Sequence, residues 1–207
     1  GSQSVLVEGN VFHSTQGYSD IIDFAGGRRP GPIMQVLNNV FLGGPDDALD
    51  IDNSDAHIEG NVFYNFRQDN VSTSTANGIA TDAFSHVVAV RNIFVGSDHA
   101  VLLKNHATLD AWNNTFVSNG AVFSFGEPLR IVAPGDSLVM RDSIVWQNGP
   151  TILDLEDPNG DVVIDIRNTI FPELSEYPGV GNFLADPQFV SAETGDFSLK
   201  RTSPARG

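Results

Sequence analysis

Three features of the sequence predict an all-β fold, a right-handed parallel β-helix solenoid of about seven rungs. A short phrase built on asparagine recurs along the chain, alternating apolar residues precede it, and turn-forming pairs such as Asn-Gly and Gly-Gly are frequent. Repeats of this kind are typical of solenoids, in which each repeat buries its apolar side against the next. We expect one domain over residues 1–207, with rungs from 4 to 170 and a C-terminal cap over 171–207.

The repeated phrase is Asn-x-Phe or Asn-x-Ile, and its copies follow one another at intervals of 22 to 31 residues. The shortest interval occurs twice and only the excess varies, as expected for loops inserted into a rung of constant length. The copies begin at Asn10, Asn39, Asn61, Asn92, Asn114 and Asn168, with a variant at Asp142-Ser143-Ile144.

The residues five and three positions before each asparagine are mostly apolar, and this alternation predicts a strand with one buried face. The pairs are Val5/Val7, Met34/Val36, Ala56/Ile58, Val87/Ala89, Leu109/Ala111 and Ser137/Val139. On the last rung Val163/Asp165 break the pattern, and neighbouring Ile164 and Ile166 indicate a shift of one residue.

A second strand precedes each of these strands, and its apolar residues align in two predicted inward columns. The first column contains Ile22, Leu49, Ile79, Val101, Phe123 and Leu153. The second contains Phe24, Ile51, Thr81, Leu103, Phe125 and Leu155. Apolar spacings of three and four, which amphipathic helices need, are missing from these segments.

The recurring asparagine is expected to have a structural role. An amide side chain can donate to one rung and accept from the next, so a column of asparagines satisfies backbone groups at buried turns. Asparagine also tolerates the left-handed conformation that such corners require. A row of ligand-binding amides is the alternative.

Composition limits the classes of function. The chain contains 11 Lys and Arg against 26 Asp and Glu, a formal net charge of −15, which argues against nucleic acid and anionic membranes as partners. No apolar run reaches the length of a membrane span. There is no cysteine, so disulfides and thiolate chemistry are excluded. Acidic polysaccharides remain possible partners if divalent cations bridge the charges.

Two segments resemble the right-handed parallel β-helix superfamily, whose best-known members are pectate lyases and related polysaccharide enzymes. The segment from Asp46 to Phe63 is similar to repeats of secreted bacterial β-helix proteins, and the segment from Ala185 to Gly207 is similar to their closing segment. The resemblance implies the fold over nearly the whole chain, and it implies secretion or a place at the cell surface. Because one fold hosts lyases, epimerases, adhesins and spacers, it leaves the activity open.

Outward positions of the second strand carry the candidate metal ligands Asp23, Asp50, Asp52 and Asp82, with Asp46 and Asp47 at the strand start. Carboxylates stacked at about 5 Å repel each other by roughly 1 kcal/mol or more per pair. Calcium would remove this cost, because it binds six to eight oxygens. The alternatives are a protonated carboxyl group or a solvated acidic surface.

Five further residues are candidates for binding or catalysis. Lys104, one rung beyond Asp82, is the candidate base of a lyase or epimerase acting on uronic acids, or an ion-pair partner of Asp82. Arg28 and Arg29 are candidate ligands of sugar carboxylates, or they balance Asp20 and Asp23. The remaining candidates for substrate binding are His99, near the aspartates, and Trp112, an outward indole suited to stacking on a sugar.

Insertions at 25–32, 126–137 and 156–161 follow the second strand and are expected at one corner of the solenoid, where loops carry function. The first strand has no preceding cap, which suggests further N-terminal rungs or end-to-end stacking. At the other end, Phe183, Phe189, Phe197 and Leu199 are expected to cover the last rung.

The sequence therefore favours an extracellular module that binds polysaccharide on an acidic strand face, assisted by calcium. A polysaccharide lyase or epimerase for uronic-acid polymers is the first alternative. A non-catalytic structural or adhesin module is the second.

Overall fold

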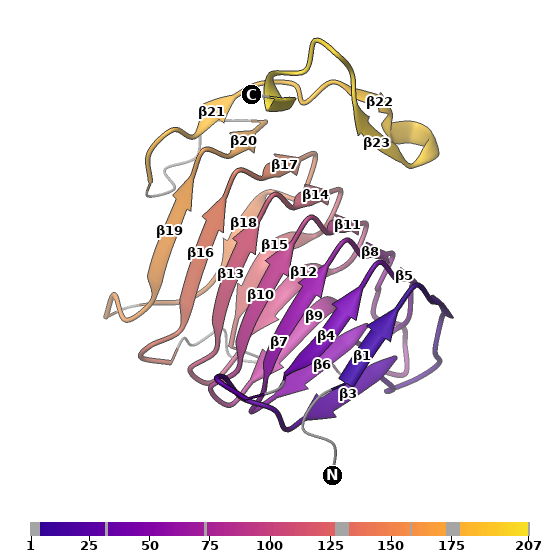
Figure 1. The fold of residues 1–207 in the computed structure, drawn as a ribbon, viewed down its shortest axis with the longest axis vertical. Helices are drawn as coiled ribbons and strands as arrows, with labels where there is room; N and C mark the ends of the chain where they lie inside the picture. The colour runs from indigo at the N-terminus through magenta and orange to yellow at the C-terminus, as the bar shows by residue number, and fades with distance from the viewer. Residues whose placement is uncertain are drawn as a thin grey trace.

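The computed structural model describes residues 5–31, 33–72, 74–126, 133–157, 159–172 and 179–206. It is a parallel β-helix: three parallel sheets run along the solenoid, and consecutive strands of one rung belong to different sheets (Figure 1). We name the sheets A, B and C. No helix among the described residues has the length and apolar character needed to cross a membrane.

Sheet A contains the strands that precede each asparagine. They are β1 (Val5–Glu8), β4 (Met34–Leu37), β7 (Asp55–Glu59), β10 (His86–Val90), β13 (Thr108–Trp112), β16 (Ser137–Arg141) and β19 (Val163–Arg167). Seven strands in this sheet agree with the expected number of rungs.

Sheet C contains the second predicted strand. Its members are β3 (Ile22–Ala25), β6 (Leu49–Asp52), β9 (Asn77–Asp82), β12 (His99–Leu103), β15 (Ala121–Phe125) and β18 (Thr151–Asp154). The parallel register pairs Ile22, Leu49, Ile79, Val101, Phe123 and Leu153 in one column, as predicted.

Sheet B is formed by the repeated phrase itself, which the sequence analysis treated as a corner. Its strands are β2 (Val11–His13), β5 (Val40–Leu42), β8 (Val62–Tyr64), β11 (Ile93–Val95), β14 (Thr115–Val117), β17 (Ile144–Trp146), β20 (Ile170–Phe171) and β21 (Phe183–Leu184). With two or three residues each, they are too short to show the alternation that identifies a strand in sequence.

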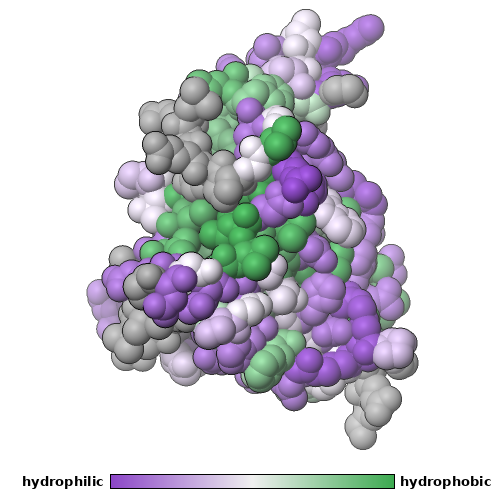
Figure 2. All heavy atoms as spheres, turned by 90° about the vertical axis from the view of Figure 1, so that its left-hand side faces the viewer, coloured by the Kyte–Doolittle hydropathy of each residue, from purple (hydrophilic) through white to green (hydrophobic). Residues whose placement is uncertain are grey.

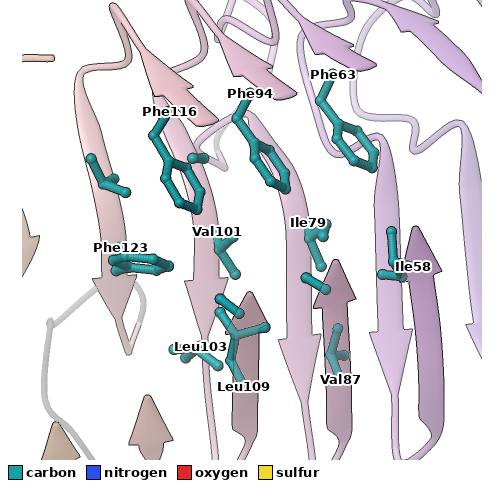
Figure 3. Close-up of a cluster of buried hydrophobic side chains, with 14 of the residues drawn as sticks. Ile58, Phe63, Ile79, Val87, Phe94, Val101, Leu103, Leu109, Phe116 and Phe123 are labelled. Carbon is teal, nitrogen blue, oxygen red and sulfur yellow. The ribbon is translucent and has the colours of Figure 1, made fainter. Parts of the chain in front are cut away.

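The interior is one continuous apolar cluster. Phe12, Phe41, Phe63, Phe94 and Phe116 form a stack with ring centroids 4.8 to 5.1 Å apart, which is close to the rung spacing. Figure 3 shows three of these rings beside the columns of sheets C and A. Offset aromatic pairs of this kind add stability beyond the burial of their area.

The asparagine ladder confirms the structural role of the repeat. The backbone N–H of Asn61 donates to Oδ1 of Asn92 over 2.9 Å, and Asn92 donates in the same way to Asn114. The Nδ2 group of Asn92 donates to the carbonyl oxygen of Ile58 over 2.8 Å. Each side chain therefore satisfies buried backbone groups that no strand partner reaches.

The alignment of the sixth rung is a correction. Asn114 donates to the hydroxyl of Ser143, not to Asp142, so the rung is shifted by one residue from the predicted alignment. The inward residues are accordingly Leu138 and Met140, both fully buried, in place of Ser137 and Val139. The predicted shift on the last rung is confirmed, because Ile164 and Ile166 pair with Leu138 and Met140.

The C-terminal segment also differs from the prediction. Its antiparallel strands β22 (Phe189–Ser191) and β23 (Asp196–Leu199) are joined by the 3₁₀ turn η1 (Ala192–Thr194), and η2 (Pro204–Arg206) ends the described chain. Phe189 packs with Val117 and Ile144 of sheet B in a second apolar cluster, which also contains Phe197 and Leu199. The segment therefore covers part of sheet B (Figure 1), while Phe183 of β21 is 39% exposed.

The last rung retains partly exposed apolar side chains. Ile152, Leu153, Leu155, Val162 and Ile164 pack against the core but are only partly buried. Figure 2, which views the molecule from this end, shows hydrophobic surface gathered in a hollow.

Candidate functional site

The predicted aspartates of sheet C lie in register. Asp23 is paired with Asp50, and Asp52 is paired with Asp82 on the next rung. Lys104 directly follows β12, and its Nζ lies 3.9 Å from Oδ2 of Asp82. Stacking of equivalent strands thus brings carboxylates from three successive rungs together, as the spacing of the repeat predicts.

The outward column of sheet C that contains Asp23 and Asp50 is not accessible to solvent along its whole length. Ala80, Leu102 and Ser124 follow Asp50 in this column, and all three are buried. Leu102 is 1% exposed although it lies outside the interior cluster. These buried residues separate the acids on the rungs of β3, β6 and β9 from Asp154 on β18, which is partly exposed further along the same column.

The closest group of carboxylates lies at the start of these strands. Asp20, Asp46 and Asp47 each offer an oxygen within 4.8 Å of the others, and among the residues that the structure describes they form the group of three acids with metal-binding spacing. Oδ1 of Asp20 accepts the backbone N–H of Asp47 over 3.2 Å. Asp46 and Asp47 lie at the strand start as predicted, but the predicted metal ligands were the outward aspartates Asp23, Asp50, Asp52 and Asp82.

His99 is connected to this group through an asparagine. Oδ1 of Asp47 accepts hydrogen bonds from the backbone N–H and Nδ2 of Asn77, at 3.0 and 2.7 Å. Nδ1 of His99 lies 3.0 Å from Oδ1 of Asn77, one rung further on. His99 therefore does not contact the acids directly. It contacts Asn77, and Asn77 donates to Asp47.

The surroundings disfavour the charged form of several carboxyl groups. Burial raises the pKa of Asp47 well above its usual value. Burial also raises the pKa of Asp50 from 3.8 to about 6, with the charges of Asp52, Asp20 and Asp23 adding to the effect and Lys104 opposing it. The pKa values of Asp20 and Asp52 are raised by the same combination of burial and like charge.

Two carboxylate oxygens at this surface lack a hydrogen-bond partner among the described residues. They are Oδ1 of Asp50 and Oδ1 of Asp52, and both atoms are buried. A buried acceptor without a partner costs about 1–3 kcal/mol, and more when it is charged. Both atoms have lone pairs available for a cation.

Lys104 is the basic residue of this surface, and its electrostatics follow from its neighbours. Burial lowers the pKa of its ammonium group, but the charges of Asp50, Asp82, Asp47 and Asp52 outweigh burial and raise it above the usual value. Lys104 is therefore held in its protonated form, as an ion-pair partner.

An exposed aromatic ring lies beside the acids. Tyr18 is 70% exposed, and the charge of Asp46 raises the pKa of its hydroxyl group. We define the acidic face as Asp20, Asp23, Asp46, Asp47, Asp50, Asp52 and Asp82 together with Lys104; Tyr18 lies at its margin.

Arg28 and Arg29 lie at the corner between sheets C and A. Arg28 donates to the carbonyl oxygens of Phe84 and Ala83, each over 3.1 Å. Nη1 of Arg29 lies 3.3 Å from Oδ2 of Asp55. The expectation that these arginines balance Asp20 and Asp23 is wrong, because Arg29 pairs with Asp55 and Arg28 bonds to corner backbone.

Trp112 belongs to a different surface. It is 40% exposed on the outer side of sheet A, in register between Val90 and Arg141. The structure thus groups the aspartates and Lys104 on sheet C but separates Trp112 from them. Of the three expected insertions, residues 32, 127–132 and 158 lie outside the described residues.

Comparison of the chain with protein-family models, curated proteins and solved structures finds no match.

Proposed function

We propose that this protein binds an acidic polysaccharide on the acidic face of sheet C, with a divalent cation such as calcium between protein and ligand. The supporting observation is the group formed by Asp20, Asp46 and Asp47, whose oxygens lie within 4.8 Å of one another in a surrounding that raises the pKa of Asp20 and Asp47. Such carboxylates are destabilised by one another until a cation or a proton is supplied.

The residues present fit a hard cation. Calcium prefers six to eight oxygen ligands, among them carboxylates, carbonyls and water. The acidic face offers carboxylate oxygens, and the unpartnered oxygens of Asp50 and Asp52 lie in the neighbouring columns. Calcium bound here would neutralise part of the negative charge and leave coordination positions for a uronic-acid carboxylate.

The protein's own residues supply the other contacts in this proposal. The ring of Tyr18 offers an exposed apolar surface for the flat side of a sugar. The ammonium group of Lys104 attracts the carboxylate of the ligand and limits repulsion among the aspartates. We propose a place outside the cell or at its surface, where calcium-binding modules function with dissociation constants of about 10⁻⁴–10⁻³ M.

The state of Lys104 favours binding over catalysis. A general base for proton abstraction must be neutral at the working pH. The acids around Lys104 raise its pKa, so the charged form dominates in the free protein. Polysaccharide cleavage or epimerisation at this surface would need the surroundings of Lys104 to change when substrate binds.

Titration of chelator-treated protein with calcium chloride, followed by calorimetry and by thermal unfolding, tests the cation. We expect binding in the range above and a rise in melting temperature, both lost in Asp46→Asn. The matched control is Glu193→Gln, which removes one charge from an exposed position of η1. If calcium produces no binding heat and no change in melting temperature in the wild type, the proposed cation site is wrong.

Affinity electrophoresis in gels containing polygalacturonate or alginate tests the ligand. We expect retardation in calcium that disappears in EGTA and in Asp46→Asn. Equal mobility with and without calcium would contradict the proposal. Ultraviolet absorbance of unsaturated products in the same incubations tests the lyase alternative, and activity that requires Lys104 would replace binding as the explanation.

A further inference from the structure

The outer side of sheet A is a second polar surface, of different character. Each acid from β7 to β19 on this side has a basic partner among the described residues. Nε2 of His86 lies 3.0 Å from Oδ2 of Asp110, and Nη2 of Arg141 lies 2.6 Å from Oδ2 of Asp165. The other pairs are Arg29 with Asp55, His57 and Arg91 with Glu59, and Arg167 with Asp165.

One column of this surface combines apolar and polar contacts at rung spacing. The parallel register aligns Glu59, Val90, Trp112, Arg141 and Arg167 on successive strands. Strands in a sheet are about 4.8 Å apart, which is close to the length of one pyranose unit in an extended glycan. A linear sugar chain laid along the column would therefore present a new ring to each rung.

Trp112 gives this column a flat apolar centre. The residue is 40% exposed, although indole side chains are usually buried. Its neighbours in register are the aliphatic Val90 and the stem of Arg141. The apolar side of a sugar ring can stack on such a surface while its hydroxyl groups reach the paired carboxylates and guanidinium groups on either side.

A cleft of about 710 Å³ begins one residue beyond Trp112. Its solenoid wall is formed at the asparagine corner by Arg91, Asn113, Asp142 and Asn168. These four residues have left-handed backbone conformations, with φ between 49° and 57°. Phe183 of β21 adds to this wall, and the C-terminal segment contributes Leu199 and Arg206 to the lining. This volume is in the range of small-molecule sites and is large enough for more than one sugar ring.

We propose that the outer side of sheet A and this cleft form a binding site for a neutral, linear polysaccharide, with Trp112 as its stacking platform. Charge balance supports a neutral ligand, because the four acids of strands β7 to β19 are matched in number by four arginines. The acids are Asp55, Glu59, Asp110 and Asp165, and the arginines are Arg29, Arg91, Arg141 and Arg167. The ion pairs also fix the donors and acceptors in place, which reduces the entropy lost on binding.

This site is independent of the cation-dependent site proposed above. It lies on another sheet, it needs no metal, and it takes a ligand without charge. Either proposal can therefore fail without the other.

Calorimetric titration in EDTA with cellohexaose, mannohexaose and xylohexaose tests the site, with wild type, Trp112→Ala and Trp112→Phe. We expect at least one hexaose to bind the wild type, with affinity about tenfold lower in Trp112→Ala and a smaller loss in Trp112→Phe. Tyr64→Ala, which removes another exposed aromatic from sheet B, is the matched control and is expected to bind normally.

A spectroscopic readout places the ligand. The chain contains two tryptophans, and Trp146 packs in the second apolar cluster, so the Trp146→Phe variant reports on Trp112 alone. Addition of the bound hexaose is expected to shift its fluorescence. The proposal is overturned if no hexaose binds, if Trp112→Ala binds as tightly as wild type, or if binding requires calcium.

Discussion

The outer surfaces of sheets C and A are built by the same stacking of strands but differ in charge. Acids are in excess on sheet C, whereas acids and bases are paired on sheet A. The acidic face has seven carboxylates and one lysine, and burial and like charge raise the pKa of Asp20, Asp47, Asp50 and Asp52. On sheet A the acids are paired, and the arginines lower the pKa of Asp165. Stacking of rungs repeats the positions of side chains, but the residue types at those positions differ. The ratio of acidic to basic side chains in a column therefore decides which ligands it can bind.

The largest expected effect is that of Lys104→Met on the acidic face. The side chains of Lys104 and Asp82 are 21% and 28% exposed, so this ion pair alone contributes about 0.2–1 kcal/mol. Lys104 also offsets the repulsion among the carboxylates of Asp47, Asp50 and Asp52, and its removal leaves that repulsion uncompensated. We expect a loss of about 1–2 kcal/mol in unfolding free energy at pH 7.5, measured by urea denaturation without calcium. The loss should shrink at pH 4.5, which is below the pKa of about 6 of Asp50, because protonated Asp50 no longer needs the charge of Lys104. A loss that does not change with pH would show that only the packing of the side chain matters.

A smaller effect is expected for Arg141→Met on sheet A. The side chains of Arg141 and Asp165 are each 25% exposed, and Arg167 still pairs with Asp165 in the variant. Such exposed pairs contribute little to stability, so we expect a loss that is clearly smaller than that of Lys104→Met. Calcium should not restore it. A loss as large as that of Lys104→Met would remove the contrast between the two surfaces.

The fold was largely predictable because the inward apolar residues of sheets A and C recur with a period of two in the sequence. The inward columns that begin at Ile22 and at Met34 take every second position of their strands, and the shared asparagine fixes their register. Sheet B was not recognised, because a strand of three residues has no measurable period. The predicted alignment of the sixth rung was wrong because Ser143 takes the place of the asparagine. Its hydroxyl oxygen accepts the backbone N–H of Asn114, as an asparagine Oδ1 does on other rungs.

The candidate site was predictable only in part. The alignment of Asp23 with Asp50 and of Asp52 with Asp82 follows from the repeat. The grouping of Asp20 with Asp46 and Asp47 depends on the turns before β3 and β6, whose path has no periodic signal. The burial of Leu102 on the outward column depends on contacts between distant segments, which a single sequence does not reveal.

Burial and like charge destabilise the ionised carboxylates of the acidic face, and a proton or a cation relieves this cost. Because the pKa of Asp50 rises from 3.8 to about 6 on folding, its protonated form favours the folded state. Its contribution to stability is therefore present below the lower value and is lost as the pH rises through the higher one.

The direct measurement is the difference in unfolding free energy between Asp50→Asn and wild type at pH 4.5 and pH 7.5, with and without calcium. After discounting for solvent screening, we expect the variant to be more stable by about 1–2 kcal/mol at pH 7.5 without calcium. The difference should become small at pH 4.5, and calcium at pH 7.5 should stabilise the wild type more than the variant. A difference that changes with neither pH nor calcium would contradict the account.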